Sequence, residues 1–327
     1  MTQNLPEEAT TALRSWYADD WNVEPLQGDA SVRAYYRLRT GSGSRFMFAY
    51  YPEAVRAGVR RFVSAWEAIA GHARVPAIVR QGSVAIVQED VGDQTLFDLL
   101  FRDREQALEF YGQAIDLLVS FQKSPPSART LNPPFDAAKF YEELEMTYTF
   151  YVAGLMRDSS ERVHDGLAAA FRKLSEKISQ HPFVLCHRDY HGQNLHIFNN
   201  QLYMIDYQDM KTGPDTYDLA SLLRDRGVGR VLGEAGELEL VRRYAASTGS
   251  EFNPLWTRYL ETLLQRSIKI IGTFAKQSVV RGRHHYLDFI PSTLESIQFC
   301  LSRLEGFEAI SELFPMEFDA EPARASV

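Results

Sequence analysis

Three polar residues of this chain have the types and the spacing needed for phosphoryl transfer: Asp189, Asn194 and Asp206. Amide and carboxylate oxygens are hard ligands, and Mg²⁺ takes few of them from a protein because water and substrate phosphates complete its octahedron. Asp189 precedes Asn194 on the same loop, where its carboxylate can accept the proton of an attacking hydroxyl. A base and two magnesium ligands predict a phosphotransferase, a reaction that asks little covalent chemistry of the protein.

A predicted β-hairpin brings the two metal-binding oxygens together. Residues 195–198 and 201–205 are short apolar-rich segments joined by the pair Asn199–Asn200. Asparagine tolerates the positive φ that a tight two-residue turn demands. If this pair is the turn, Asn194 lies opposite the residue before Asp206, so the two candidate ligands stand side by side at the open end of the hairpin.

The spacing of these residues resembles a known family. His187-Arg188-Asp189, with Asn194 and Asp206, is similar to the H-x-D-x-x-x-x-N pattern and later aspartate of protein kinases and aminoglycoside phosphotransferases. The resemblance implies that Asp189 is the catalytic base, that His187 organises the catalytic loop, and that Asn194 and Asp206 bind Mg²⁺ beside ATP. It also implies that Asp218 is a structural residue that ties the next helix to this loop.

The resemblance extends along nearly the whole chain. Residues 28–38 resemble the nucleotide-covering loop, residues 87–93 the hinge, and residues 264–276 the C-terminal helix of the family. These stretches most resemble the anomeric kinases of N-acetylmuramate and N-acetylglucosamine. The implied ATP contacts come from the loop and from backbone groups of the hinge; they are Gly28, Ser31, Arg33, Glu89 and Val91.

One element of the kinase pattern is missing. Kinases carry a lysine on the third strand that binds the α- and β-phosphates and pairs with a helix glutamate, but the expected strand, residues 45–51, contains no lysine. The following helix offers no convincing glutamate either. Two interpretations follow: another cation, first Arg33 and second Arg37, neutralises the phosphates, or the protein is a catalytically silent kinase-like binding module.

The elements around these residues predict an α+β, bilobal protein-kinase-like fold. Strand-like and turn-like patterns dominate up to residue 92, whereas helical periodicity dominates from residue 95 onward. We therefore expect a small β-rich N-terminal nucleotide-binding lobe (1–92) and a larger helical lobe (93–327) that carries the catalytic and substrate-binding residues. The length of 327 residues suits two such lobes.

The predicted acceptor is a small molecule with a hydroxyl group, most plausibly a sugar or amino sugar. Kinases of choline, homoserine, fructosamine and aminoglycosides are the alternatives within this class. Substrate contacts are expected from Glu143 and Glu145, on a predicted helix whose acidic face could instead be solvated, and from Asp209 and Arg224.

Composition predicts where such a protein works and what it avoids. The net charge of -8 argues against broad binding to nucleic acid or anionic lipid, and no apolar run is long enough to span a membrane. Two cysteines cannot form a disulfide framework, so a reducing cytoplasm is expected. The oligomeric state is left open.

Overall fold

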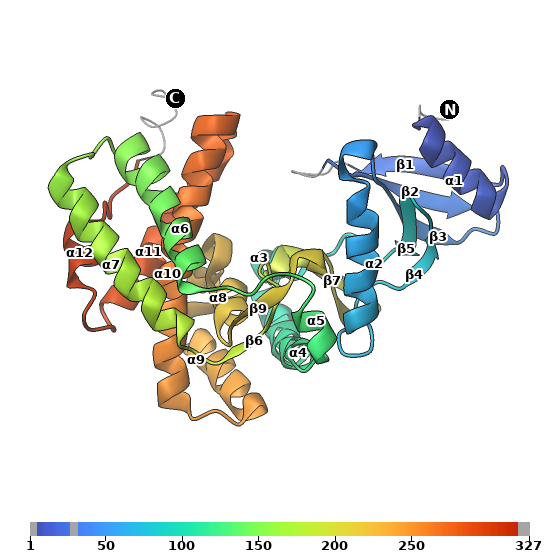
Figure 1. The fold of residues 1–327 in the computed structure, drawn as a ribbon. Coiled ribbons are helices and arrows are strands. Elements are labelled where there is room, and N and C mark those ends of the chain that lie inside the picture. Colours follow the sequence, from blue (N-terminus) through green and yellow to red (C-terminus); the bar gives the residue numbers. More distant parts are fainter. Residues whose placement is uncertain (1–4, 27–31, 320–327) are drawn as a thin grey trace.

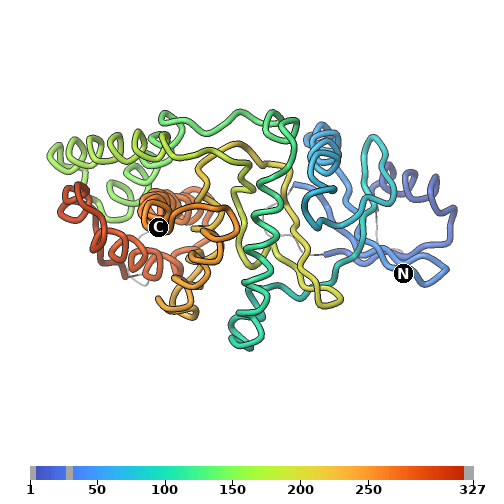
Figure 2. The backbone as a smooth tube through the Cα atoms, turned by 90° about the horizontal axis from the view of Figure 1, so that it is seen from below, coloured from blue at the N-terminus to red at the C-terminus, as the bar shows by residue number. Residues whose placement is uncertain are grey.

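The computed structural model describes residues 5–26 and 32–319. Its N-terminal part is an antiparallel sheet with two helices, and its C-terminal part is mainly helical, so the expected α+β kinase-like fold is confirmed (Figure 1). Figure 2 shows the same division from below, with the blue N-terminal part on one side, the light-green and orange-to-red helices on the other, and teal-green and yellow segments between them. The boundary after residue 92 stays a prediction.

The N-terminal sheet has the strand order β1-β2-β3-β5-β4, and all neighbouring strands are antiparallel. Its elements are α1 (Glu7–Tyr17), β1 (Trp21–Leu26), β2 (Ala34–Thr40), β3 (Arg45–Tyr50), α2 (Ala57–Ile69), β4 (Ile78–Gln81) and β5 (Ala85–Glu89). Helix α1 packs Ala9 and Leu13 into a small core with Phe48 and Val87 of the sheet. Strand β3 coincides with the strand expected over residues 45–51, and α2 is the helix expected after it.

Helices make up most of the remaining chain, and several pack around one long central helix. They are α3 (Leu96–Arg102), α4 (Arg104–Gln122), α5 (Pro126–Arg129), α6 (Ala137–Thr147), α7 (Glu161–Ser179), α8 (Tyr217–Arg224), α9 (Val228–Thr248), α10 (Phe252–Arg281), α11 (Ile290–Leu301) and α12 (Glu308–Leu313). Helix α10 contacts α6, α8 and α11, and its buried face carries residues such as Leu264, Ile268 and Ile271. In the described part of the chain, no helix has the length and apolar character that crossing a membrane requires.

Two small antiparallel pairs lie between the sheet and the helices: β6 (Phe183–Cys186) with β9 (Lys211–Pro214), and β7 (Leu195–Phe198) with β8 (Gln201–Met204). The chain between β6 and β9 therefore leaves and returns beside the same strand pair. Asp189, Asn194 and Asp206 all lie on this segment, and the pairing of β6 with β9 fixes both of its ends.

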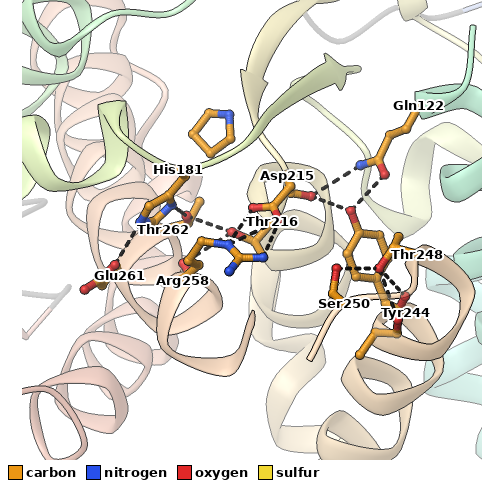
Figure 3. A network of polar contacts seen from close by, with 12 residues as sticks. Gln122, His181, Asp215, Thr216, Tyr244, Thr248, Ser250, Arg258, Glu261 and Thr262 are labelled. Carbon is orange, nitrogen blue, oxygen red and sulfur yellow. Dashed lines mark hydrogen bonds and ion pairs between the residues drawn. The ribbon is translucent and has the colours of Figure 1, made fainter. Parts of the chain in front are cut away.

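A network of polar contacts fixes the start of α8, just after β9 (Figure 3). The Asp215 carboxylate binds Arg258 of α10, with 2.7 Å between Oδ2 and Nη2, and the Asp215 carbonyl accepts from the Tyr244 hydroxyl of α9 at 2.7 Å. Thr216 donates to Thr262 of α10 at 2.9 Å. Helices α9 and α10 thus position the start of α8, the helix that carries Asp218.

Candidate active site

The hairpin β7–β8 has the predicted register. Leu195 lies opposite Met204, and the Ile205 amide donates to the Asn194 carbonyl at 3.0 Å. Asn199 and Asn200 both have positive φ, 49° and 60°, which is the backbone that a twisted two-residue turn requires. The predicted pairing of Asn194 with the residue before Asp206 is therefore confirmed.

The catalytic loop is held by Asp218 and His187. The Asp218 carboxylate accepts the backbone amides of His187, at 2.6 Å, and of Arg188, at 2.9 Å. Both His187 and Asp218 are fully buried, and the His187 Nε2 lies 2.8 Å from the Ile205 carbonyl. Arg188 has a φ of 84°, a left-handed conformation that these paired bonds stabilise. Helix α8, the loop and the hairpin are thereby joined through two side chains.

Asp189 follows this turn and is surrounded by cations. Burial raises the pKa of its carboxyl, but Lys269, Arg266, His191 and His187 outweigh burial and lower that pKa to about 2. Asn194 donates its side-chain N–H to the Asp189 carbonyl at 2.9 Å, which leaves the Asn194 amide oxygen for another partner. At neutral pH Asp189 is therefore an ionised carboxylate that can only accept hydrogen bonds.

A cleft of about 560 Å³ lies between the N-terminal sheet and the hairpin. Residues from both sides line it, including Arg33, Met47, Glu89, Val91, Asn194 and Asp206. Val91 is buried, and within the described residues its N–H makes no hydrogen bond to another backbone group. Its contact with adenine, which the resemblance to kinases implies, stays a prediction.

Arg33 lies over the candidate metal ligands. Its Nη2 is 3.5 Å from the Asp206 Oδ1, and its guanidinium carbon is 5.6 Å and 5.8 Å from the ring centroids of Tyr35 and Tyr51. The structure therefore brings this predicted cation to the cleft. Gly28 and Ser31, the other two residues predicted from the nucleotide-covering loop, lie outside the described residues.

Arg37 is not placed at the phosphates, contrary to its selection as the second candidate cation. Its guanidinium binds the carboxylates of Asp90, with Nε–Oδ2 at 2.9 Å, and Asp93, with Nη2–Oδ1 at 2.7 Å. Two hinge acids therefore hold its charge, a pairing between distant residues that strand alternation cannot reveal. Met47 of β3 lines the cleft on the strand where kinases carry lysine, and Arg61 of α2, where they carry glutamate, binds Asp209.

A second cavity, of about 170 Å³, opens beside Asp189 and is lined entirely by the helical lobe. Its walls include Asp189, His191, Arg226, Arg266, Lys269 and Gln277. Arg266 is buried and bound to Asp225 at 2.6 Å and to the Arg188 carbonyl at 3.0 Å, so it links the pocket to the catalytic loop. Asp189 thus lies at the wall of the pocket, and the oxygens of Asn194 and Asp206 lie in the cleft. This arrangement suits the transfer of a group between two molecules, one bound in each cavity.

The four residues expected to contact substrate lie in different places. Arg224 lines the pocket beside Asp189, but Glu237 binds its guanidinium and the Phe299 ring centroid lies 3.9 Å from its guanidinium carbon. Asp209 lines the nucleotide-side cleft instead. Glu143 is buried and accepts from Gln265 at 3.2 Å, which contradicts a solvated face, and neither Glu143 nor Glu145 lines the pocket. Helix α10 covers Glu143, which periodicity on α6 alone could not show.

The oxygens of Asn194 and Asp206 fit a magnesium ion. Both residues line the cleft, and Gln208 donates to Asp206 Oδ1 at 2.9 Å, which leaves Oδ2 for a ligand. Asp206 adopts a left-handed φ of 62°, and the Arg33 guanidinium lies 3.5 Å from its carboxylate. Two hard oxygens that leave most of an octahedron to water and phosphate are what Mg²⁺ with a nucleotide requires.

Several residues that shape the site carry no motif signal. Arg226, Arg266, Lys269 and Gln277 belong to the connection after α8 and to α10, and their positions depend on how α10 packs. Lys269 and Arg266 lie within residues 264–276, which resemble the family's C-terminal helix, and this resemblance was the one sequence feature that linked them to the site. Arg61 had none, since a pair of arginines on an exposed helix face is usually solvated.

The sequence is similar to known proteins along most of its length. The profile described as "Phosphotransferase enzyme family" matches residues 22–261. A protein of Pseudomonas putida named N-acetylmuramate/N-acetylglucosamine kinase is 29% identical over 304 residues, covering 89% of this chain and 87% of its own length. A protein of the same name from Pseudomonas aeruginosa is 27% identical and covers 88% of this chain and 86% of its own length.

Solved structures share the fold at lower sequence identity. An ADP-bound aminoglycoside phosphotransferase, APH(2'')-Ib, has a TM-score of 0.63 with 13% identity, covering 90% of this chain and 99% of that one. A Plasmodium vivax ethanolamine kinase has a TM-score of 0.64 with 11% identity, covering 93% and 94%.

Proposed function

Because this chain belongs to the phosphotransferase enzyme family, we propose that it transfers the γ-phosphoryl group of ATP to a hydroxyl of an amino sugar, with Mg²⁺ as cofactor. The acceptor class is supported by four relatives that all bear the name N-acetylmuramate/N-acetylglucosamine kinase. The anomeric hydroxyl of these sugars is the proposed nucleophile, in line with the resemblance drawn from the sequence.

One observation carries this proposal: the loop from Asp189 to Asn194 separates two cavities and contributes to both. Asp189 lines the smaller pocket, Asn194 lines the larger cleft, and the Asn194 side chain donates to the Asp189 carbonyl at 2.9 Å. An acceptor in the pocket and a triphosphate in the cleft would therefore meet at this loop, with the base and the metal-binding oxygens fixed relative to each other.

In the proposed reaction the acceptor oxygen forms a bond to the γ-phosphorus, and the bond from that phosphorus to the β–γ bridging oxygen breaks, so ADP leaves. The hydroxyl proton moves to the Asp189 carboxylate and then to water. Because the pKa of Asp189 is about 2, this carboxylate is a weak base. It suits a loose transition state, in which the hydroxyl is oriented early and its proton departs late.

Binding of the triphosphate is assigned to groups of both lobes. The backbone of Glu89 and Val91 would hold the adenine, and Arg33 would contact the phosphates in place of the absent strand lysine. A magnesium ion held by Asn194 and Asp206 would supply the positive charge that neutralises the phosphate oxygens. On nucleotide binding, Arg33 would exchange its 3.5 Å contact with Asp206 for phosphate oxygens.

The test is an ATP-consumption screen with magnesium over amino sugars, neutral sugars, choline, ethanolamine, homoserine, fructosamines and aminoglycosides. We expect turnover with N-acetylmuramate or N-acetylglucosamine and a product labile to mild acid, as an anomeric phosphate is. Turnover confined to an amino alcohol or an aminoglycoside would overturn the acceptor assignment. Tight ATP binding with no turnover of any acceptor would favour a silent binding module.

A further inference from the structure

The pocket beside Asp189 is lined by four cations, and acids already accompany three of them. Arg224 is bound by Glu237, and Arg266 is bound by Asp225. Lys269 makes no ion pair or hydrogen bond among the described residues, but Tyr217, Glu143 and Asp189 raise the pKa of its ammonium against the effect of burial. Two of the four charges therefore have direct partners inside the protein, and negative groups stabilise the third.

Arg226 is the fourth cation and differs from the others. Among the described residues its side chain makes neither an ion pair nor a hydrogen bond; it packs against the Phe289 ring, whose centroid lies 5.7 Å from the guanidinium carbon. The residue is half-buried and lines the pocket. A guanidinium in such a place keeps all its donors for a ligand, and its planar fork matches a carboxylate.

The backbone at Arg226 is also unusual. Its φ of 54° and ψ of 34° are left-handed, a conformation that is costly for a residue with a Cβ, and it interrupts the chain between α8 and α9. Arg226 lies at the pocket wall next to Asp225, which forms an ion pair with Arg266 of α10. The strained residue is thus held next to a strong ion pair that fixes its position.

Among the described residues, two buried polar atoms of side chains that line this pocket have no hydrogen-bond partner. They are Gln277 Oε1 on α10 and His191 Nδ1 on the catalytic loop. Burial lowers the pKa of His191 to about 4, so its ring is neutral at pH 7 and can accept as well as donate. Buried polar atoms are normally hydrogen-bonded, so this pair points to a polar ligand that supplies hydroxyl or amide groups.

We propose that Arg226 binds an anionic substituent of the acceptor, a carboxylate, and that this contact makes the pocket prefer an acidic amino sugar to its neutral counterpart. Gln277 and His191 then bind the uncharged ring substituents that both sugars share. This inference rests on the proposed function, since it assigns the specificity of the same site.

The experiment compares two acceptors that differ in charge, N-acetylmuramate, which carries a carboxylate, and N-acetylglucosamine, which does not. Steady-state kcat and KM are measured for both with the parent, Arg226→Gln, Arg226→Lys and a control, Arg230→Gln. Arg230 lies on α9, outside the pocket, in an exposed ion pair with Glu295. Its loss removes the same charge from the protein without removing it from the pocket.

Arg226→Gln should lower kcat/KM for N-acetylmuramate by about 10- to 100-fold, mainly through KM, because a charge-assisted hydrogen bond is lost. The value for N-acetylglucosamine should stay within about threefold. Arg226→Lys should recover part of the acidic-sugar activity, and Arg230→Gln should match the parent with both sugars.

Equal losses with both sugars, or none with either, would overturn the inference while leaving the proposed function intact. So would a parent that prefers the neutral sugar. A parent that phosphorylates neither sugar would overturn the proposed function and, with it, this assignment.

Discussion

The nucleotide-side cleft and the pocket beside Asp189 adjoin the same loop but are built in different ways. The cleft takes its lining from both parts of the chain, and among the described residues an ion pair of 3.5 Å, between Arg33 and Asp206, joins its two sides. The pocket belongs to the helical lobe alone, and a buried ion pair of 2.6 Å, Arg266 with Asp225, supports it.

This difference in construction suggests that the cleft determines nucleotide affinity and that the pocket positions the acceptor. Because the cleft is lined by both parts of the chain, we expect its geometry to change more readily than that of the pocket, and its polar residues to contribute less to folding. The pocket is preformed, since two of its cations, Arg224 and Arg266, already form ion pairs within the helical lobe. Substitutions in the cleft should therefore change nucleotide binding with little effect on stability, whereas substitutions around the pocket should change turnover or stability.

The largest expected effect is at the loop between the two cavities. Asp189→Asn should lower turnover by roughly two to four orders of magnitude, because an amide cannot take the hydroxyl proton. ATP affinity should stay close to that of the parent, since Asp189 does not line the cleft. Steady-state kinetics and calorimetry together test this, and near-normal turnover would remove Asp189 from its assigned role.

A second test concerns the metal. Asp206→Ala should abolish most nucleotide binding and make the remainder independent of magnesium, because one of two hard oxygens is lost beside a triphosphate. Calorimetric titration with ATP, with and without magnesium, gives the comparison. Equal ATP affinity in the parent under both conditions would contradict the metal assignment.

A smaller effect is expected at Arg33. Arg33→Ala should raise the KM for ATP by about tenfold and lower turnover, because one charge-assisted contact to phosphate is lost. The melting temperature without ligand should barely change, since its contact with Asp206 is long and partly exposed. Arg39→Ala, an exposed arginine on β2, is the matched control. Parent-like kinetics in Arg33→Ala would move the phosphate contact to another cation.

The smallest effect is a pH dependence of stability from His191. Its folded pKa of about 4 lies below its ordinary value of 6.5, so between these values the unfolded chain binds a proton that the folded protein does not. Stability from this group is therefore complete above pH 6.5 and falls as the pH drops toward 4. Melting temperatures between pH 7 and 5 should fall less steeply in His191→Gln than in the parent; parallel curves would show that His191 titrates normally.

The sequence was most informative where local backbone chemistry decides the structure. Asn199 and Asn200 accept left-handed φ, so they fixed the hairpin register and, through it, the pairing beside Asp206. The hairpin depends on a few neighbouring residues, and a sequence displays such residues directly. Asp218 was predicted in another way, from the resemblance to the family, because the two amides that it binds lie 31 and 30 positions before it in the chain.

The sequence was least informative where distant elements pair. Arg37 looks like any strand arginine until Asp90 and Asp93 of the hinge meet it, and Glu143 looks solvated until α10 covers it. Helix α1 was not predicted, because its buried face consists of only two residues, Ala9 and Leu13, and gives a weak periodic pattern. Substrate specificity falls in the same group, since Arg226 and Gln277 come together only when α10 packs against the turn after α8.

The two hydrogen bonds that Asp218 accepts from backbone amides should also set how long the catalytic loop stays closed. A solvent-exposed loop ordinarily opens on its own, many times for each global unfolding event. Here the amides of His187 and Arg188 are bound to a buried carboxylate at the start of α8, and α9 and α10 anchor the residues just before it. Those two amides should exchange with deuterium as slowly as the centre of α10. The catalytic loop would then be among the last parts of the molecule to open, and its geometry would survive the fluctuations that let nucleotide enter the cleft.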